Sequence, residues 1–139
     1  MRNKEKTVVV IGTMDTKGLE LAYLAEQIKA AGCRTLLMDV GTRGESGVTA
    51  DIPVEKVVGC IGEKIEAIRS LPRGDAVEKM CRAAAACLNQ IVDSGKAHGV
   101  IGLGGSGGTT ICCAAMRALP YGIPKYMVST LASGNTRWH

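Results

Sequence analysis

The sequence has few aromatic residues: no phenylalanine, one tryptophan and three tyrosines among 139 residues. Single-stranded nucleic acids bind to aromatic stacking platforms within basic grooves. Lys and Arg exceed Asp and Glu only by 17 to 13, and apart from Arg2, Lys4 and Lys6 the basic residues are scattered. The lack of aromatics and of a basic cluster argues against a nucleic-acid partner.

Metal-binding and membrane-spanning patterns are also missing. The six cysteines show no CxxC spacing, and only two histidines accompany them, which argues against a zinc site. No apolar run approaches the roughly 18 residues of a membrane-spanning helix, so we expect no membrane insertion. Several cysteines occupy apolar helix or strand positions, where we expect reduced thiols that pack as small hydrophobes in a cytoplasmic protein.

Strand and helix patterns alternate along the chain. Short apolar runs predict strands, and apolar residues at helical spacing predict the helices between them. Strands separated by helices form parallel units, so we expect an open, mainly parallel, doubly wound (Rossmann-like) α/β sheet in three layers. The expected strands are residues 7–11, 35–40, 100–103 and 126–131, and the expected helices are 17–31, 77–92 and 109–119.

Residues 41–74 interrupt this alternation. A polar loop is followed by apolar residues at helical spacing from Val54 to Ile68, with Gly59 and Gly62 inside the pattern. Glycine within a helix costs about 1 kcal/mol relative to alanine, so this helix is the weakest of those expected. We expect the segment to be an insertion or a lid.

The loop after the third expected strand is rich in glycine. Consecutive glycines let several backbone N–H groups approach an anion, and the N-terminus of the following helix favours phosphate. We expect a Cβ on Gly107 to block the approach of a phosphate and to forbid a positive φ there. The alternative is a tight turn with a Ser or Thr helix cap. The candidate phosphate-binding residues are Gly104, Gly105, Ser106, Gly107, Gly108, Thr109 and Thr110.

A standard dinucleotide site is disfavoured. Gly102, Gly104 and Gly107 satisfy G-x-G-x-x-G, but a single match to this pattern is weak evidence. No Asp or Glu follows Asp93, so the acid that binds the ribose about 20 residues after the glycines is missing. The Walker pattern of P-loop proteins is absent as well.

The loop after the first expected strand holds five further candidates: Gly12, Thr13, Asp15, Thr16 and Lys17. Lys17 has the charge and length to reach a phosphate, and Asp15 the carboxylate to hold Mg²⁺ directly or through water. In the alternative interpretation, Asp15 or Thr16 caps the helix and Lys17 lies in solvent.

Two other loops leave the same edge of the sheet. Asp39 ends the second expected strand, where such folds bind a ribose, although it is equally suited to capping the turn. The loop after the fourth strand offers hydroxyl, amide and backbone groups for an anion, from Thr130, Ser133, Gly134, Asn135 and Thr136. No histidine is expected at this edge, so the sequence offers no nucleophile–base pair. Cys112 and Cys113 fall within a helix and are expected to pack.

Three stretches in this order, residues 10–17, 100–109 and 127–136, resemble the family typified by the tomato mosaic virus resistance protein. The resemblance implies an ATP-binding, Rossmann-like region of two subdomains. It implies that residues 12–17 and 104–110, with 129–136 beside them, hold the phosphates. It also implies that residues 1–139 form one nucleotide-binding subdomain, the first of a longer protein.

We therefore expect a module that binds ATP or a related nucleotide with Mg²⁺, regulatory or non-catalytic in this part of the protein. One alternative is an ATP-using enzyme whose acceptor site lies in the second subdomain, with Asp15 and Lys17 acting on the phosphoryl group. A weaker alternative is a dinucleotide-dependent oxidoreductase. Because an open sheet edge invites pairing with another chain, we expect self-association, as a dimer.

Overall fold

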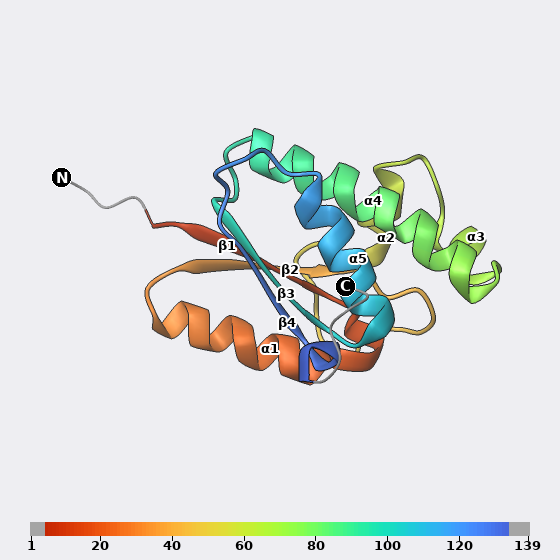
Figure 1. Cartoon of the computed structure of the whole chain (residues 1–139), viewed down its shortest axis with the longest axis horizontal. Coiled ribbons are helices and arrows are strands. Elements are labelled where there is room, and N and C mark those ends of the chain that lie inside the picture. The colour runs from red at the N-terminus through yellow and green to blue at the C-terminus, as the bar shows by residue number, and fades with distance from the viewer. Residues whose placement is uncertain (1–4, 134–139) are drawn as a thin grey trace.

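Four parallel strands in the order β2-β1-β3-β4 form the sheet of the computed structural model, which describes residues 5–133 (Figure 1). All three strand pairs are parallel, so the open, Rossmann-like α/β class predicted from the alternating pattern is confirmed. The strands are β1 (Thr7–Gly12), β2 (Arg34–Asp39), β3 (Gly99–Gly104) and β4 (Lys125–Ser129).

Helices cover both faces of this sheet. One helix, α1, lies on one face, while α2, α4 and α5 lie on the other, with α3 beside α4 (Figure 1). None of the helices within residues 5–133 is both long enough and apolar enough to cross a membrane. The helices are α1 (Met14–Ala30), α2 (Val54–Gly59), α3 (Ile65–Arg69), α4 (Arg73–Asp93) and α5 (Ser106–Arg117), and a short 3₁₀ helix, η1 (Thr130–Ser133), follows β4.

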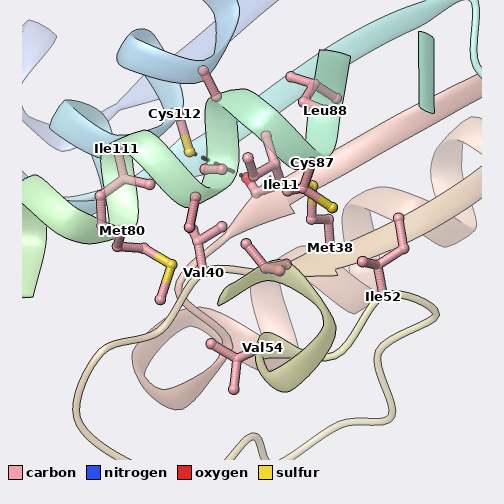
Figure 2. Close-up of a cluster of buried hydrophobic side chains, with 14 of the residues drawn as sticks. Ile11, Met38, Val40, Ile52, Val54, Met80, Cys87, Leu88, Ile111 and Cys112 are labelled. Carbon is pink, nitrogen blue, oxygen red and sulfur yellow. Dashed lines mark hydrogen bonds between the residues drawn. The ribbon is translucent and has the colours of Figure 1, made fainter. Parts of the chain in front are cut away.

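The alternation of side chains along β1 divides the core into two clusters. Ile11 faces the larger cluster, between the sheet and α2–α5, which includes Met80 of α4 (Figure 2). Val10 faces the smaller cluster, beneath α1. Cys112 of α5 lies in the larger cluster, and its Sγ donates a weak hydrogen bond to the Ile11 carbonyl oxygen at 3.5 Å. Burial raises the pKa of this thiol to about 12, which confirms the packing role expected for Cys112.

Glycines at positive φ end or separate several helices. Gly32 (φ 96°) follows α1 and Gly95 (φ 76°) follows α4. Gly62 (φ 73°) lies between α2 and α3, so the single helix expected across residues 54–68 is two short ones. The left-handed conformation that glycine allows is what stops a helix at each of these points.

Three helices begin earlier than their apolar stripes indicated. Helix α1 begins at Met14 rather than residue 17, α4 at Arg73 rather than 77, and α5 at Ser106 rather than 109. The first turn of each is polar or rich in glycine, so it carries no stripe to reveal it. As a result, Gly107 and Gly108 belong to the first turn of α5 and not to a loop.

Residues 41–74 are built into the larger core. Val57 and Ile68 are fully buried there, and Ile52 forms an isolated parallel bridge with Met38 at the end of β2. The apolar side chains of this segment therefore form part of the larger core cluster.

Two leucines of α1, Leu19 and Leu21, allow core packing to be distinguished from surface effects. Leu21 is fully buried whereas Leu19 is 79% exposed. Replacing a buried leucine by alanine costs about 2–5 kcal/mol, and exposed substitutions usually change stability by less than about 0.5 kcal/mol. We expect Leu21→Ala to lower the free energy of unfolding in urea by the larger amount and Leu19→Ala to leave it nearly unchanged. Equal losses would contradict the orientation of α1.

Candidate functional site

The strand order creates a switch point between β1 and β3. From β1 the chain crosses to β2 on one side, whereas β3 and β4 lie on the other side. In open parallel sheets, ligands bind beyond the carboxyl ends of the strands at such a point. A cavity of about 170 Å³ lies there, between the first turns of α1, α4 and α5, and we call it the glycine-loop cavity. Its wall contains Thr13, Asp15, Thr16, Thr42, Arg43, Arg73, Val77, Gly105, Ser106, Gly107, Gly108 and Ile111.

Two of the predicted glycines serve packing. A Cβ on Gly12 would lie 2.7 Å from the Leu103 carbonyl oxygen, and a Cβ on Gly104 would lie 3.0 Å from Gly108 Cα. Neither glycine lines the glycine-loop cavity. Their missing side chains let β1, β3 and the first turn of α5 come close together.

The other three glycines leave space empty of protein. A Cβ on Gly105, Gly107 or Gly108 would have its nearest neighbour at 3.8, 4.0 or 3.6 Å, which is ordinary van der Waals contact. None of the three has positive φ, so the positive φ expected for Gly107 is wrong. They are not needed for backbone conformation or for packing. What they provide is open room at the start of α5.

The N-terminus of α5 faces this room with unpaired donors. Gly105 is the N-cap residue, and no side chain caps the helix, so the predicted alternative of a Ser or Thr cap is not seen. The first N–H group with a partner is that of Thr109, which donates to the Gly105 carbonyl oxygen at 2.9 Å. Within residues 5–133, the N–H groups of Ser106, Gly107 and Gly108 have no acceptor. Unpaired N–H groups and the helix dipole favour an anion.

The hydroxyl groups of Thr109 and Thr110 are bound within the protein. Thr109 Oγ1 lies 2.7 Å from Ser129 Oγ, and Thr110 Oγ1 donates to the Ser106 carbonyl oxygen at 3.1 Å. These bonds join α5 to the end of β4 and to its own first turn. Neither threonine lines the glycine-loop cavity, although the sequence predicted both as phosphate ligands.

Asp15 ties the first turn of α1 to the loop after β2. Its Oδ2 accepts hydrogen bonds from the N–H groups of Arg43 and Gly44, both at 3.1 Å. Its Oδ1 is buried and has no partner among the described residues. Across residues 5–133 there is no group of three or more His, Cys, Asp or Glu side chains arranged to hold a metal. Asp15 is therefore a single carboxylate whose second oxygen is buried beside Gly41.

Asp39 holds a turn, the second of the two roles that the sequence left open. Its Oδ1 accepts hydrogen bonds from the Gly41 N–H at 2.9 Å and the Met14 N–H at 3.1 Å. Burial raises the pKa of Asp39, and the nearby Asp15 adds to the rise, while the two backbone donors oppose it. The carboxylate joins the end of β2 to the first residue of α1.

The remaining candidates lie around the cavity rather than on its wall. Lys17 is in α1, half-buried, and does not line it. Thr130 begins η1, and its Oγ1 would be 3.8 Å from a Cβ on Gly105, which places η1 beside the glycine loop. Ser133 ends η1. Gly134, Asn135 and Thr136 lie outside the described residues.

Two arginines on the cavity wall are not among the site residues predicted from the sequence. Arg43 follows β2 and Arg73 is the first residue of α4, and both line the glycine-loop cavity. The loop after β2 pointed to Arg43, which was not singled out. No local pattern pointed to Arg73, because its position depends on how α3 and α4 pack.

The raised pKa of Asp39 predicts a pH-dependent stability. Because the folded state binds this proton more tightly than the unfolded chain, its contribution is full below the ordinary pKa of 3.8 and is lost as pH rises through the folded pKa. Asp39→Asn keeps an oxygen for both donors but does not titrate. We expect the stability of the variant relative to the parent, from urea unfolding, to increase as pH rises through this range. A difference that stays constant with pH would contradict the burial of an ionised Asp39.

Known proteins similar to this chain confirm the resemblance noted from three motifs. The N-terminal domain of the uncharacterised protein family UPF0261 matches residues 6–139. The UPF0261 protein of Clostridium tetani is 44% identical over 133 residues, which are 95% of this chain and 33% of that protein. A UPF0261 protein of Rhizobium meliloti is 47% identical over 131 residues, 94% of this chain and 32% of that protein.

A plant protein is also similar. The ToMV resistance protein Tm-1(GCR237) of Solanum lycopersicum is 37% identical over 145 residues, 93% of this chain and 19% of the plant protein. The chain thus spans about a third of the length of the two bacterial relatives and less of the plant one. With the match extending over nearly all its length, the chain belongs to the UPF0261 family and corresponds to that family's N-terminal domain.

Proposed function

We propose that this domain binds the phosphate groups of a nucleotide, ATP or a related one, at the glycine-loop cavity. The proposal rests on the space beside Gly105, Gly107 and Gly108. Neither close packing nor a positive φ requires glycine at these three positions. Into this space open the unpaired N–H groups of the first turn of α5. Such a helix N-terminus at the switch point of a parallel sheet suits a phosphate.

The size of the cavity supports a phosphate site rather than a complete nucleotide site. Its volume of about 170 Å³ is below the roughly 300–1,000 Å³ of typical small-molecule pockets. Contacts to the base and sugar would then come from outside residues 5–133, consistent with relatives about three times as long. No histidine or cysteine is among the described residues on the wall, which supports a regulatory or binding role.

Mg²⁺ fits this proposal through Asp15. Mg²⁺ is commonly held by one or two carboxylates, with phosphate oxygens and water completing its coordination. Asp15 lies on the cavity wall and its Oδ1 has no partner among the described residues. We also propose a cytoplasmic location, since all six cysteines are free.

An ATP-using enzyme is the second candidate, favoured by Arg43 and Arg73 on the wall. Fixed cations beside a phosphoryl group stabilise the charge that develops during its transfer. The acceptor would bind in the part of the longer protein beyond this domain. Formation of ADP by a full-length family member would favour this candidate over a binding module. The dinucleotide-dependent oxidoreductase has no observation in its favour, because Asp39 serves the turn.

Gly107→Val tests the phosphate site. The added side chain enters space that the protein leaves open, 4.0 Å from Val77, so we expect the fold to survive and ATP binding in calorimetry to be lost. Gly74→Val is the matched control, because Gly74 lies in the first turn of α4, off the cavity wall, with no atom within 4 Å of its Cβ position. Circular dichroism would confirm that both variants fold. A folded Gly107→Val variant that binds ATP like the parent would place the site elsewhere.

Self-association through the edge of the sheet remains a prediction. Strand β4 is at one edge, and its Tyr126 and Val128 are 68% and 42% exposed. We propose that β4 pairs with β4 of a second copy, since an unpaired strand edge invites such pairing. Light scattering should give the mass of a dimer, and Tyr126→Lys should shift it to a monomer. Tyr121→Lys, at a fully exposed position outside the strand, should not. A parent that is monomeric at every concentration would refute the proposal.

A further inference from the structure

A second cavity, of about 260 Å³, adjoins the glycine-loop cavity. Three arginines from different elements line it: Arg43 after β2, Arg69 at the end of α3 and Arg73 at the start of α4. Thr42, Arg43 and Arg73 line both cavities, so the two are contiguous. We call the second one the arginine cavity.

The protein gives these arginines no acidic partner. The ion pairs among residues 5–133 are Lys29–Glu26, Arg34–Glu5 and Lys79–Glu63, and the wall of the arginine cavity contains no Asp or Glu. Arg69 also borders a hollow whose wall includes Asp39, Glu45 and Glu55, yet it forms no ion pair with them. Like charges around one space repel each other, and a bound anion would reduce this repulsion.

Arg69 is the most constrained of the three. Its Nη2 donates to the Gly44 carbonyl oxygen at 3.0 Å, which holds the guanidinium beside the loop after β2. Its Nε is buried and has no partner among the described residues. A buried donor without an acceptor costs free energy, and an oxyanion in the cavity is a suitable acceptor.

We infer that the arginine cavity binds the terminal phosphates of a polyphosphate chain whose first phosphate lies at the start of α5. This inference rests on the proposed function and narrows its ligand class to triphosphates. Arg43 and Arg73, on both walls, would contact the middle of the chain, and Arg69 would contact its end. Arginine suits this role because its planar group donates two parallel hydrogen bonds to phosphate oxygens.

The test is a binding series at fixed ionic strength, with phosphate, pyrophosphate and tripolyphosphate and in parallel AMP, ADP and ATP. We expect affinity to rise with each added phosphate. Arg69→Gln should weaken tripolyphosphate and ATP binding by about 10- to 100-fold, the scale of a hydrogen bond to a charged group, and leave phosphate and AMP unchanged. Arg82→Gln, at an exposed site on α4 outside both cavities, is the control and should change neither.

Arg43→Gln keeps the test decisive if Arg69→Gln fails to fold. The Arg43 side chain is exposed, and only its backbone N–H bonds to Asp15, so this variant should fold and should weaken the triphosphates selectively. Equal affinity for mono- and triphosphates would overturn the inference while leaving the phosphate site at α5 intact. Failure of every phosphate compound to bind would overturn both. Unchanged triphosphate binding in the folded arginine variants would overturn the inference alone.

Discussion

Two carboxylates hold together the loops on which the candidate site depends. Asp39 Oδ1 binds the N–H groups of Met14 and Gly41, and Asp15 Oδ2 binds those of Arg43 and Gly44. Each carboxylate accepts hydrogen bonds from backbone N–H groups that have no backbone acceptor, at the start of a helix or in an irregular loop. Together they fix the start of α1 against the loop after β2. Together with the hydrogen bond from Arg69 to the Gly44 carbonyl oxygen, that attachment holds Arg43 beside the glycine loop.

The glycines divide into two groups that a sequence alone does not separate. Gly12 and Gly104 have no room for a Cβ, whereas Gly105, Gly107 and Gly108 have room that the protein does not use. Gly12 and Gly104 allow β1, β3 and α5 to pack closely. This packing fixes the positions of the other three glycines. Four glycines in five residues therefore reflect both a packing requirement and a free space. Only the second group bears on a ligand.

Sequence reasoning predicted the sheet, the parallel strands and the glycine loop, because buried β-branched strands and apolar helical stripes are local patterns. It placed the start of α5 too late and gave Gly107 positive φ, because a glycine-rich helical turn has no stripe and resembles a loop. It could not separate the two roles of Asp39, which differ only in what lies opposite the carboxylate. Arg69 and Arg73 were out of reach, since the packing of residues 41–74 brings them to the site.

The segment 41–74 thus connects core packing to the charge of the site. Its buried residues, such as Val57 and Ile68, complete the larger cluster, and in doing so they fix α3 and the start of α4. Arg73, at the start of α4, then lies beside the first turn of α5 and adds its charge to the partial positive charge of that helix N-terminus, while Arg69 lies in the adjoining cavity. Under the proposed function, we expect a site assembled in this way to be selective for charge more than for shape, because its described walls are small and carry arginines and backbone N–H groups. Shape selectivity would have to come from the larger part of the family's chain, beyond this N-terminal domain.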